Sequence, residues 1–119
     1  MKKHYIIFLA LALFLLNVKG FSQLYINEYS ASNLDQYPDN YGKYEDWIEI
    51  YNAGNNYVNL NGYFLSDDSL FRNKWSFPNV SVQAKGYLRI WASGRNESSG
   101  FDIHTSFKLS QTKKDECII

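Results

Sequence analysis

The segment from Tyr44 to Asp68 alternates apolar and polar positions in two short runs. In the first run, Ile48 and Ile50 occupy every second position, and a period of two residues is typical of a half-buried β-strand. The residues AGNN (53–56) follow, and glycine and asparagine readily adopt the left-handed backbone angles of a chain reversal. The alternation resumes at Val58. The pattern therefore predicts two β-strands joined by a turn, and no helix.

Three further segments show the same period. They are Leu24 to Tyr29, Trp75 to Phe77 and Tyr87 to Ala92. Each alternates apolar residues with polar or aromatic ones, so each is predicted to be a strand that contributes one face to a core. Aromatic residues make up 18% of the chain, which favours pleated and half-buried surfaces. We predict a single all-β domain.

The polar segment from Ser30 to Lys43 is the longest predicted loop. Loops of more than about 12 residues in a compact domain tend to be functional or mobile, so we expect this surface to be the first to bind a partner. Tyr37, Tyr41 and Tyr44 lie along it. They could stack on sugar rings or anchor a protein partner, but aromatic side chains tend to be buried. We therefore favour a loop that folds back over one end of the domain.

Six ordered blocks of sequence cover nearly everything after residue 22. They are LYINEYSASN (24–33), EDWIEIYNAG (45–54), VNLNGYFLSDD (58–68), KWSFP (74–78), AKGYLRIWASG (84–94) and HTSFKLS (104–110). In order and separation they resemble the lamin tail domain, which occurs at the end of nuclear lamins and in many secreted or surface bacterial proteins. The resemblance implies an immunoglobulin-like β-sandwich, and we expect the secreted bacterial type.

The resemblance also implies an accessory role. Bacterial copies of the domain often accompany other exported domains, including hydrolases, nucleases and kinase-like spore-coat domains. A function in the nuclear lamina is not implied, because a leader replaces the coiled-coil rod and the nuclear targeting signal of lamins. The domain of this family continues through a last strand, so we expect residues 23–119 to form the domain with that strand incomplete at Ile119.

The first 22 residues have the pattern of a secretory signal peptide. Lys2 and Lys3 precede twelve apolar or aromatic residues (5–16), and the small residues Gly20 and Ser22 stand before the expected cleavage point. An uncleaved anchor is the alternative, but twelve residues fall short of the roughly 20 that span a bilayer core. We therefore predict a cleaved signal at 1–22, a secreted or cell-surface destination and no stable membrane span after cleavage.

The net charge and the cysteine content limit the possible partners and cross-links of the chain. The chain has 12 basic and 12 acidic residues, and removing Lys2, Lys3 and Lys19 with the signal leaves a net charge of −3. No basic stripe remains to follow a phosphate backbone, so nucleic-acid binding is not expected. Cys117 is the single cysteine, which excludes an intrachain disulfide, and we interpret it as a small apolar residue of the last strand.

The sequence offers little for catalysis. Six acidic residues are candidates for paired acids: Glu28, Glu45, Asp46, Glu49, Asp67 and Asp68. Asp67 with Asp68, or Glu28 with Asp46 and Glu49, are candidates for calcium ligands. None stands out as a pair, and the ordered calcium-loop pattern is absent. His104 is the single histidine after the signal, without a nucleophile or zinc motif. We predict no catalytic, cofactor-binding or metal-binding residues, no cofactor, and Asp and Asn side chains that bond turn backbones.

The expected function is adhesion or docking by a noncatalytic module, with an unknown protein or a polysaccharide at the cell surface as the partner. The oligomeric state is left open. Two alternatives remain. The first is a carbohydrate-binding module that uses Tyr41 or Trp75, although the strand positions of Trp47, Trp75 and Trp91 favour structural roles. The second is the N-terminal accessory domain of a larger exported enzyme.

The intact mass of the natively secreted protein tests the signal peptide and the length together. We expect the mature chain to begin at Gln23, because cleavage follows the small residue Ser22. A mass that retains residues 1–22 would contradict cleavage. A mass equal to Gln23 to Ile119 would contradict the larger enzyme, whereas a much greater one would support it.

Overall fold

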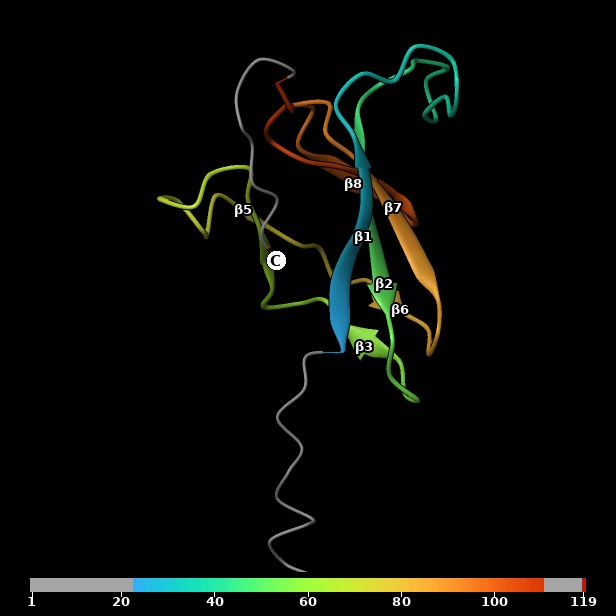
Figure 1. Cartoon of the computed structure of the whole chain (residues 1–119), viewed down its shortest axis with the longest axis vertical. Helices are drawn as coiled ribbons and strands as arrows, with labels where there is room; N and C mark the ends of the chain where they lie inside the picture. The colour runs from blue at the N-terminus through green and yellow to red at the C-terminus, as the bar shows by residue number, and fades with distance from the viewer. Residues whose placement is uncertain (1–22, 111–118) are drawn as a thin grey trace, which may run out of the picture.

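The computed structural model describes residues 23–110 and 119 (Figure 1). Within these residues it contains strands and no helix, so no helix there is long and apolar enough to cross a membrane. The prediction of an all-β domain is confirmed. The predictions of a signal peptide at 1–22, of a role for Cys117 and of an incomplete last strand fall mainly on residues outside the described part. They stay predictions.

Nine strands follow one another in the described part of the chain. They are β1 (Leu24–Ser30), β2 (Trp47–Asn52), β3 (Val58–Asn59), β4 (Phe64–Leu65), β5 (Trp75–Ser76), β6 (Ser81–Val82), β7 (Tyr87–Trp91), β8 (Glu97–Ser99) and β9 (Asp102–His104).

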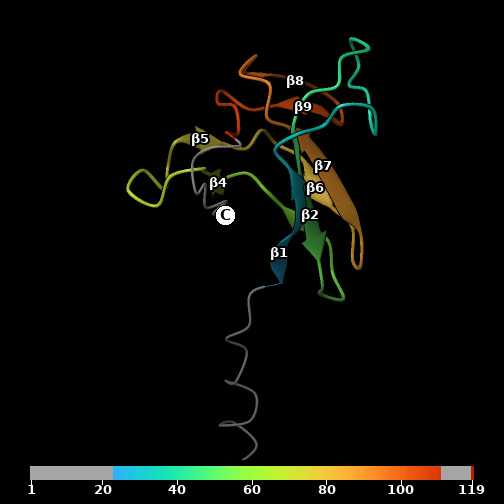
Figure 2. The ribbon, with the colours of Figure 1, turned by 45° about the horizontal axis from the view of Figure 1, so that its top comes forward.

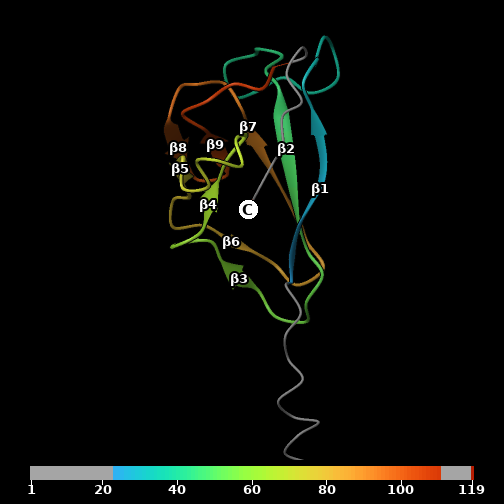
Figure 3. The same ribbon diagram turned by 60° about the vertical axis from the view of Figure 1, so that its left-hand side comes forward.

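The strands form two layers. One layer is a five-stranded sheet in the order β1-β2-β7-β9-β8, in which every neighbouring pair is antiparallel except β7 and β9. The other layer consists of the short pairs β3-β6 and β4-β5, which lie across from the large sheet (Figure 3). This is the expected immunoglobulin-like β-sandwich.

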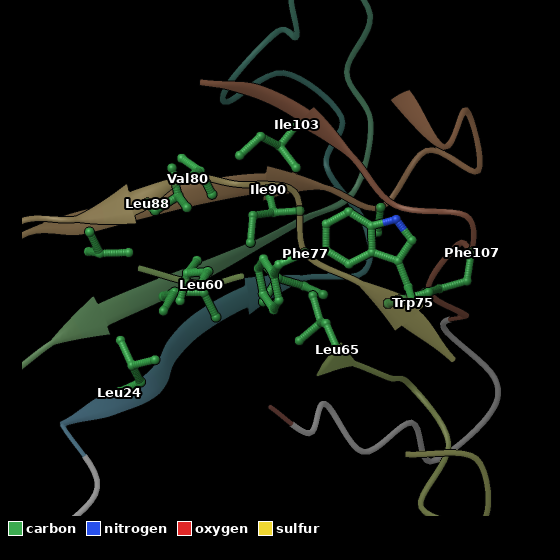
Figure 4. Packing of buried hydrophobic residues seen from close by; sticks show 14 of the residues in the cluster. Leu24, Leu60, Leu65, Trp75, Phe77, Val80, Leu88, Ile90, Ile103 and Phe107 are labelled. Carbon is green, nitrogen blue, oxygen red and sulfur yellow. The ribbon is translucent and has the colours of Figure 1, made fainter. Parts of the chain in front are cut away.

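The core lies between the layers (Figure 4). Ile48 and Ile50 of β2 and Ile90 of β7 are fully buried, and Ile48 stands opposite Ile90 in the strand register. Leu60 and Leu65 meet them from the other layer and are equally buried. Burying such a side chain contributes about 1.5–3 kcal/mol, so the alternation seen in the sequence accounts for both the strands and the packing.

The outer face of the large sheet carries a row of tyrosines. Tyr25 stands opposite Tyr51, and Tyr51 stands opposite Tyr87, in adjacent strands. The rings of Tyr51 and Tyr87 are stacked with centroids 4.7 Å apart. Such cross-strand aromatic pairs contribute roughly 0.2–1 kcal/mol each, so the row supports the alignment of β1, β2 and β7.

The predicted turn after β2 depends on a buried asparagine. Asn52 is fully buried, and its Nδ2 donates hydrogen bonds to the carbonyl oxygens of Asn56 at 2.8 Å and of Val82 at 3.0 Å. Its Oδ1 accepts a hydrogen bond from the Gly54 amide at 2.9 Å. The side chain thus satisfies backbone groups on both sides of the chain reversal and fastens β2 to β6.

Candidate functional site

The long loop between β1 and β2 meets β8 and β9 at one end of the sandwich (Figure 2). We call this region the loop end. It comprises residues 31–46, β8 and the segments that adjoin β8. The long loop is the segment that the sequence predicts to bind a partner, whereas β8 carries no pattern that predicts a role.

Buried side chains hold the long loop in one conformation. Asn33 donates from Nδ2 to the carbonyl oxygens of Tyr37 and Glu45, both at 2.9 Å, and it is only 6% exposed. Asp39 is also buried and accepts hydrogen bonds at Oδ1 from the amides of Tyr41 at 2.9 Å and Lys43 at 2.8 Å. Because the loop satisfies its own backbone through these side chains, it can keep its shape without regular secondary structure.

Two of the three loop tyrosines fold back onto the sheet as expected. The ring of Tyr37 meets Trp47 edge to face at 5.7 Å, and the guanidinium carbon of Arg89 lies 3.6 Å from the Tyr37 centroid. Tyr41 lies over His104 with the ring centroids 5.8 Å apart. The two rings remain 42% and 48% exposed, and Tyr44 is 49% exposed. Tyr37 and Tyr41 therefore cover part of the sheet while nearly half of each residue stays exposed.

A buried histidine connects the loop to the sheet. His104 is 1% exposed, with Nε2 2.7 Å from Asn40 Oδ1 and Nδ1 2.7 Å from Ser93 Oγ. Since the Asn40 oxygen can only accept, Nε2 carries the hydrogen and Nδ1 accepts from the Ser93 hydroxyl. The Ser93 oxygen in turn accepts from the Arg95 amide at 3.2 Å. These contacts form a continuous chain of hydrogen bonds, which we call the His104 relay.

The serine and histidine of the relay do not form a nucleophilic site. The Ser93 hydroxyl donates to a histidine nitrogen, as an activated nucleophile would, but Ser93 is only 6% exposed and its oxygen also accepts from the Arg95 amide. A nucleophile needs room beside it for an acyl carbon and for the donors that stabilise the oxyanion. The arrangement suits a structural connection between β9 and the loop.

Tyr41 joins the loop to β8. Its hydroxyl donates to Glu97 Oε1, and the guanidinium carbon of Arg95 lies 4.1 Å from the centre of its ring. The hydrogen bond to Glu97 raises the pKa of Tyr41 above its ordinary value of 10.0, and desolvation and the negative charge of Glu97 act in the same direction. The charge of Arg95 opposes them. The phenol, which is protonated at neutral pH even at its ordinary pKa, therefore keeps its hydrogen bond to Glu97 to a higher pH than a free tyrosine would.

Two hollows flank β8, and we call them together the β8 cleft. The first, of about 190 Å³, is lined by Trp75, Ser76, Pro78, Asn96, Glu97, Ser98 and His104. The second, of about 110 Å³, is lined by Asn40, Tyr41, Glu97, Ser98, Ser99 and Asp102. Glu97 and Ser98 belong to both, so β8 forms the wall between them. The lining is mostly of hydroxyl, amide and carboxylate groups.

Asn96 fixes one wall of the cleft. Its backbone has φ +52°, in the left-handed region that few residues other than glycine adopt, and asparagine is one of the tolerant ones. Its Oδ1 accepts a hydrogen bond from Trp75 Nε1 at 3.1 Å. This contact links the start of β8 to β5, so the two layers of the sandwich are joined at the first hollow.

The three tryptophans are buried, Trp75 in the core between the layers and Trp47 and Trp91 opposite each other on the outer face of the large sheet. Trp47, Trp75 and Trp91 are 2%, 6% and 7% exposed, and Trp75 packs against Phe77 with ring centroids 4.9 Å apart. Their predicted structural role is confirmed. The alternative in which Trp75 forms a sugar platform is wrong, because a stacking platform must present a ring face to solvent.

The six acidic candidates are spread over the domain. Asp67 pairs with Lys74 at 2.6 Å, and Asp68 accepts at Oδ1 from the Leu70 amide at 2.9 Å, as expected of a turn residue. Glu49 accepts at Oε1 from Asn27 Nδ2 at 2.8 Å on the outer face of the sheet. Among the residues described, no group of three His, Cys, Asp or Glu side chains is placed to hold a metal ion.

Replacing Ser93 with alanine tests the His104 relay. We expect Ser93→Ala to lower the free energy of unfolding by about 1–3 kcal/mol, because it leaves the buried Nδ1 of His104 without a donor. Urea denaturation of the whole chain measures the change. The matched control is Ser106→Ala at an exposed position, with an expected effect within about 0.5 kcal/mol. Equal stability of the two variants would refute the relay as a structural connection.

Titration of Tyr41 tests its bond to Glu97. We expect Glu97→Ala to lower the pKa of Tyr41 toward 10.0, because it removes the hydrogen bond and the negative charge that raise it. With the folded pKa raised, the contact stabilises the domain below the unfolded pKa of about 10 and is lost as pH rises through the raised value. The carbon-13 shift of the Tyr41 Cζ reports the titration. Glu28→Ala, on β1, is the control, and an unchanged Tyr41 pKa in Glu97→Ala would contradict the assignment.

Comparison with known proteins agrees with the geometry. A family model described as Lamin Tail Domain matches residues 17–119. No curated protein and no solved structure matches the chain. The match covers most of the chain, including all nine strands and the loop end. The protein therefore belongs to the lamin tail domain family, a family of noncatalytic immunoglobulin-like modules.

Proposed function

We propose that the protein is exported and that its lamin tail domain docks it to a cell-surface partner through the loop end. The observation that carries this proposal is the β8 cleft. It combines two hollows lined by polar groups with a loop that buried side chains hold in place. The family supplies the noncatalytic scaffold, and the signal pattern at residues 1–22 supports export.

Preorganisation makes the loop end suitable for binding. Ordering a flexible loop at an interface costs about 0.5–1.5 kcal/mol for each immobilised side chain. Here Asn33, Asp39 and the His104 relay already hold the loop, and Tyr41 is already bonded to Glu97. Folding has therefore already ordered the side chains that a partner at the loop end would contact, so binding there loses little further conformational entropy.

The chemistry of the loop end favours docking over turnover. The Ser93 hydroxyl is buried, and the His104 nitrogens both have partners. The exposed groups of the cleft are hydroxyls, amides and carboxylates, which donate and accept hydrogen bonds and attract cations. Such a surface recognises a partner by shape and polarity. In an exported protein with further domains, the same surface would position a neighbouring enzyme on its target.

A retention assay tests the proposal. Labelled chain is incubated with intact cells of the source species, washed, and the retained fraction is measured. We expect Tyr41→Ala and Ser98→Lys each to reduce the affinity at least about tenfold, because both alter the cleft. The control is Tyr57→Ala, since Tyr57 is 66% exposed and precedes β3 at the opposite end of the sandwich (Figure 1).

Each outcome of the retention assay supports or contradicts a specific part of the proposal. Melting temperatures verify that the variants are folded. If Tyr41→Ala is unfolded, Ser98→Lys still tests the cleft, because Ser98 is exposed and its replacement is not expected to disturb folding. Equal retention of all variants would show that binding occurs elsewhere, and no retention of the native chain would overturn docking to the cell surface. The same variants on a panel of immobilised glycans determine whether the partner is a polysaccharide.

A further inference from the structure

We propose that the β8 cleft binds an extended polypeptide segment, which adds as a strand along β8 and places a lysine or arginine side chain beside Glu97 and Asp102. This inference rests on the proposed docking function and names the class of partner. Its evidence is the position of β8 at the edge of the described sheet, the hollow that adjoins it and the charge of the groups that line the cleft.

β8 is an edge strand of the large sheet. It pairs with β9 on one side, and no other described strand pairs with it. Its three residues, Glu97–Ser99, are all exposed. Unpaired backbone groups on a sheet edge are a template for another strand, and many peptide-binding domains use this mode of recognition.

The first hollow lies between two strand edges. One wall is β8, and the other includes Trp75 and Ser76 of β5, which pairs with β4 alone among the described strands. The bond from Trp75 Nε1 to Asn96 Oδ1 connects the two walls. A polypeptide in this hollow would therefore lie next to β8 and would also contact the second layer of the sandwich.

The opposite edge of the sheet is less suited to strand addition. β1 has a shift in register between Ile26 and Glu28, and such bulges bend and twist an edge. The register of β8 with β9 is regular along its whole length. Neither strand contains proline or lysine, so the bulge of β1 is what distinguishes the two edges. The two edges of one sheet thus differ in their readiness to accept a strand.

The lining of the second hollow selects a basic side chain. Glu97 and Asp102 supply two carboxylates, and Asn40, Ser98 and Ser99 add amide and hydroxyl oxygens. Among the residues that the structure describes, no lysine or arginine lines either hollow. Arg95, which immediately precedes Asn96, lies over the ring of Tyr41. A cation from outside would complement this lining, because opposite charges in register give both specificity and a faster encounter.

The size of the second hollow agrees with this occupant. Its volume of about 110 Å³ is several times the roughly 30 Å³ that a water molecule occupies in the liquid. It therefore has room for an ammonium or guanidinium group together with part of its aliphatic stem. Tyr41 holds Glu97 through the hydroxyl bond, so one carboxylate is already oriented.

A peptide library provides the first test. The probes are acetylated and amidated seven-residue peptides with alternating threonine and valine flanks, randomised at four positions, and with a fixed central lysine, arginine, norleucine or glutamate. Binding to the whole chain is measured by fluorescence anisotropy on the best sequence of each set. We expect the lysine and arginine peptides to bind at least tenfold more tightly than the norleucine and glutamate peptides.

Variants locate the binding site. The double variant Glu97→Gln with Asp102→Asn is expected to abolish the preference for a basic centre, because it removes both carboxylates and keeps the side-chain sizes. The control Asp35→Asn, at an exposed position of the loop, should leave the preference unchanged. A preference that survives the double variant, or no preference at all, would overturn the proposal.

Two N-methylated forms of the best peptide test strand addition. A peptide that adds to β8 points every second amide toward β8 and the others away from it. Methylating the amides that face β8 should therefore abolish binding, while methylating the amides in between should leave binding intact. Equal effects of the two methylated forms would overturn strand addition.

Retention on cells together with binding to glycans and not to peptides would overturn this inference and leave the docking function standing. A dimer in sedimentation that Glu97→Gln dissociates would identify a second copy as the occupant and would equally overturn it.

Discussion

The shape of the loop end depends on one buried imidazole. His104 lies in β9, inside the large sheet, yet its two nitrogens reach a residue of the long loop on one side and Ser93 on the other. A buried polar group without a partner costs about 1–3 kcal/mol, so the imidazole strongly favours the arrangement in which both partners are present. The loop, the start of β8 and the sheet are therefore ordered together. The second hollow, which lies between the loop and β8, follows from that order.

Strand positions were predictable because their cause is local. The two-residue period of β2 and β7 can be recognised from consecutive residues. It is sufficient to place Ile48, Ile50 and Ile90 on the buried face of their strands. The turn after β2 was likewise predictable from glycine and asparagine. The structure adds the buried Asn52, whose importance depends on the distant carbonyl of Val82. The sandwich itself was expected from the resemblance of six blocks to a known family, since the alternation alone does not determine which strands pair.

The cleft could not be predicted because its contacts join residues far apart in the chain. Asn40 and His104 are separated by 64 positions, and Tyr41 and Glu97 by 56. The sequence of β8 does not predict a strand either, because its three residues are charged or hydroxylic and show no apolar alternation. That absence has a physical reason. An edge strand exposed on every residue has no face to bury, so the hydrophobic pattern that identifies core strands does not appear in it.

The same scaffold thus uses two kinds of strand for two purposes. Central strands such as β2 bury one face and carry the stability of a domain whose single cysteine allows no intrachain disulfide. β8 contributes little to that stability, because its residues are exposed and it pairs on one side. A sequence change in β8 therefore alters the surface at small cost to folding, whereas a change in β2 destabilises the core. Recognition can therefore change at such an edge while the core is kept.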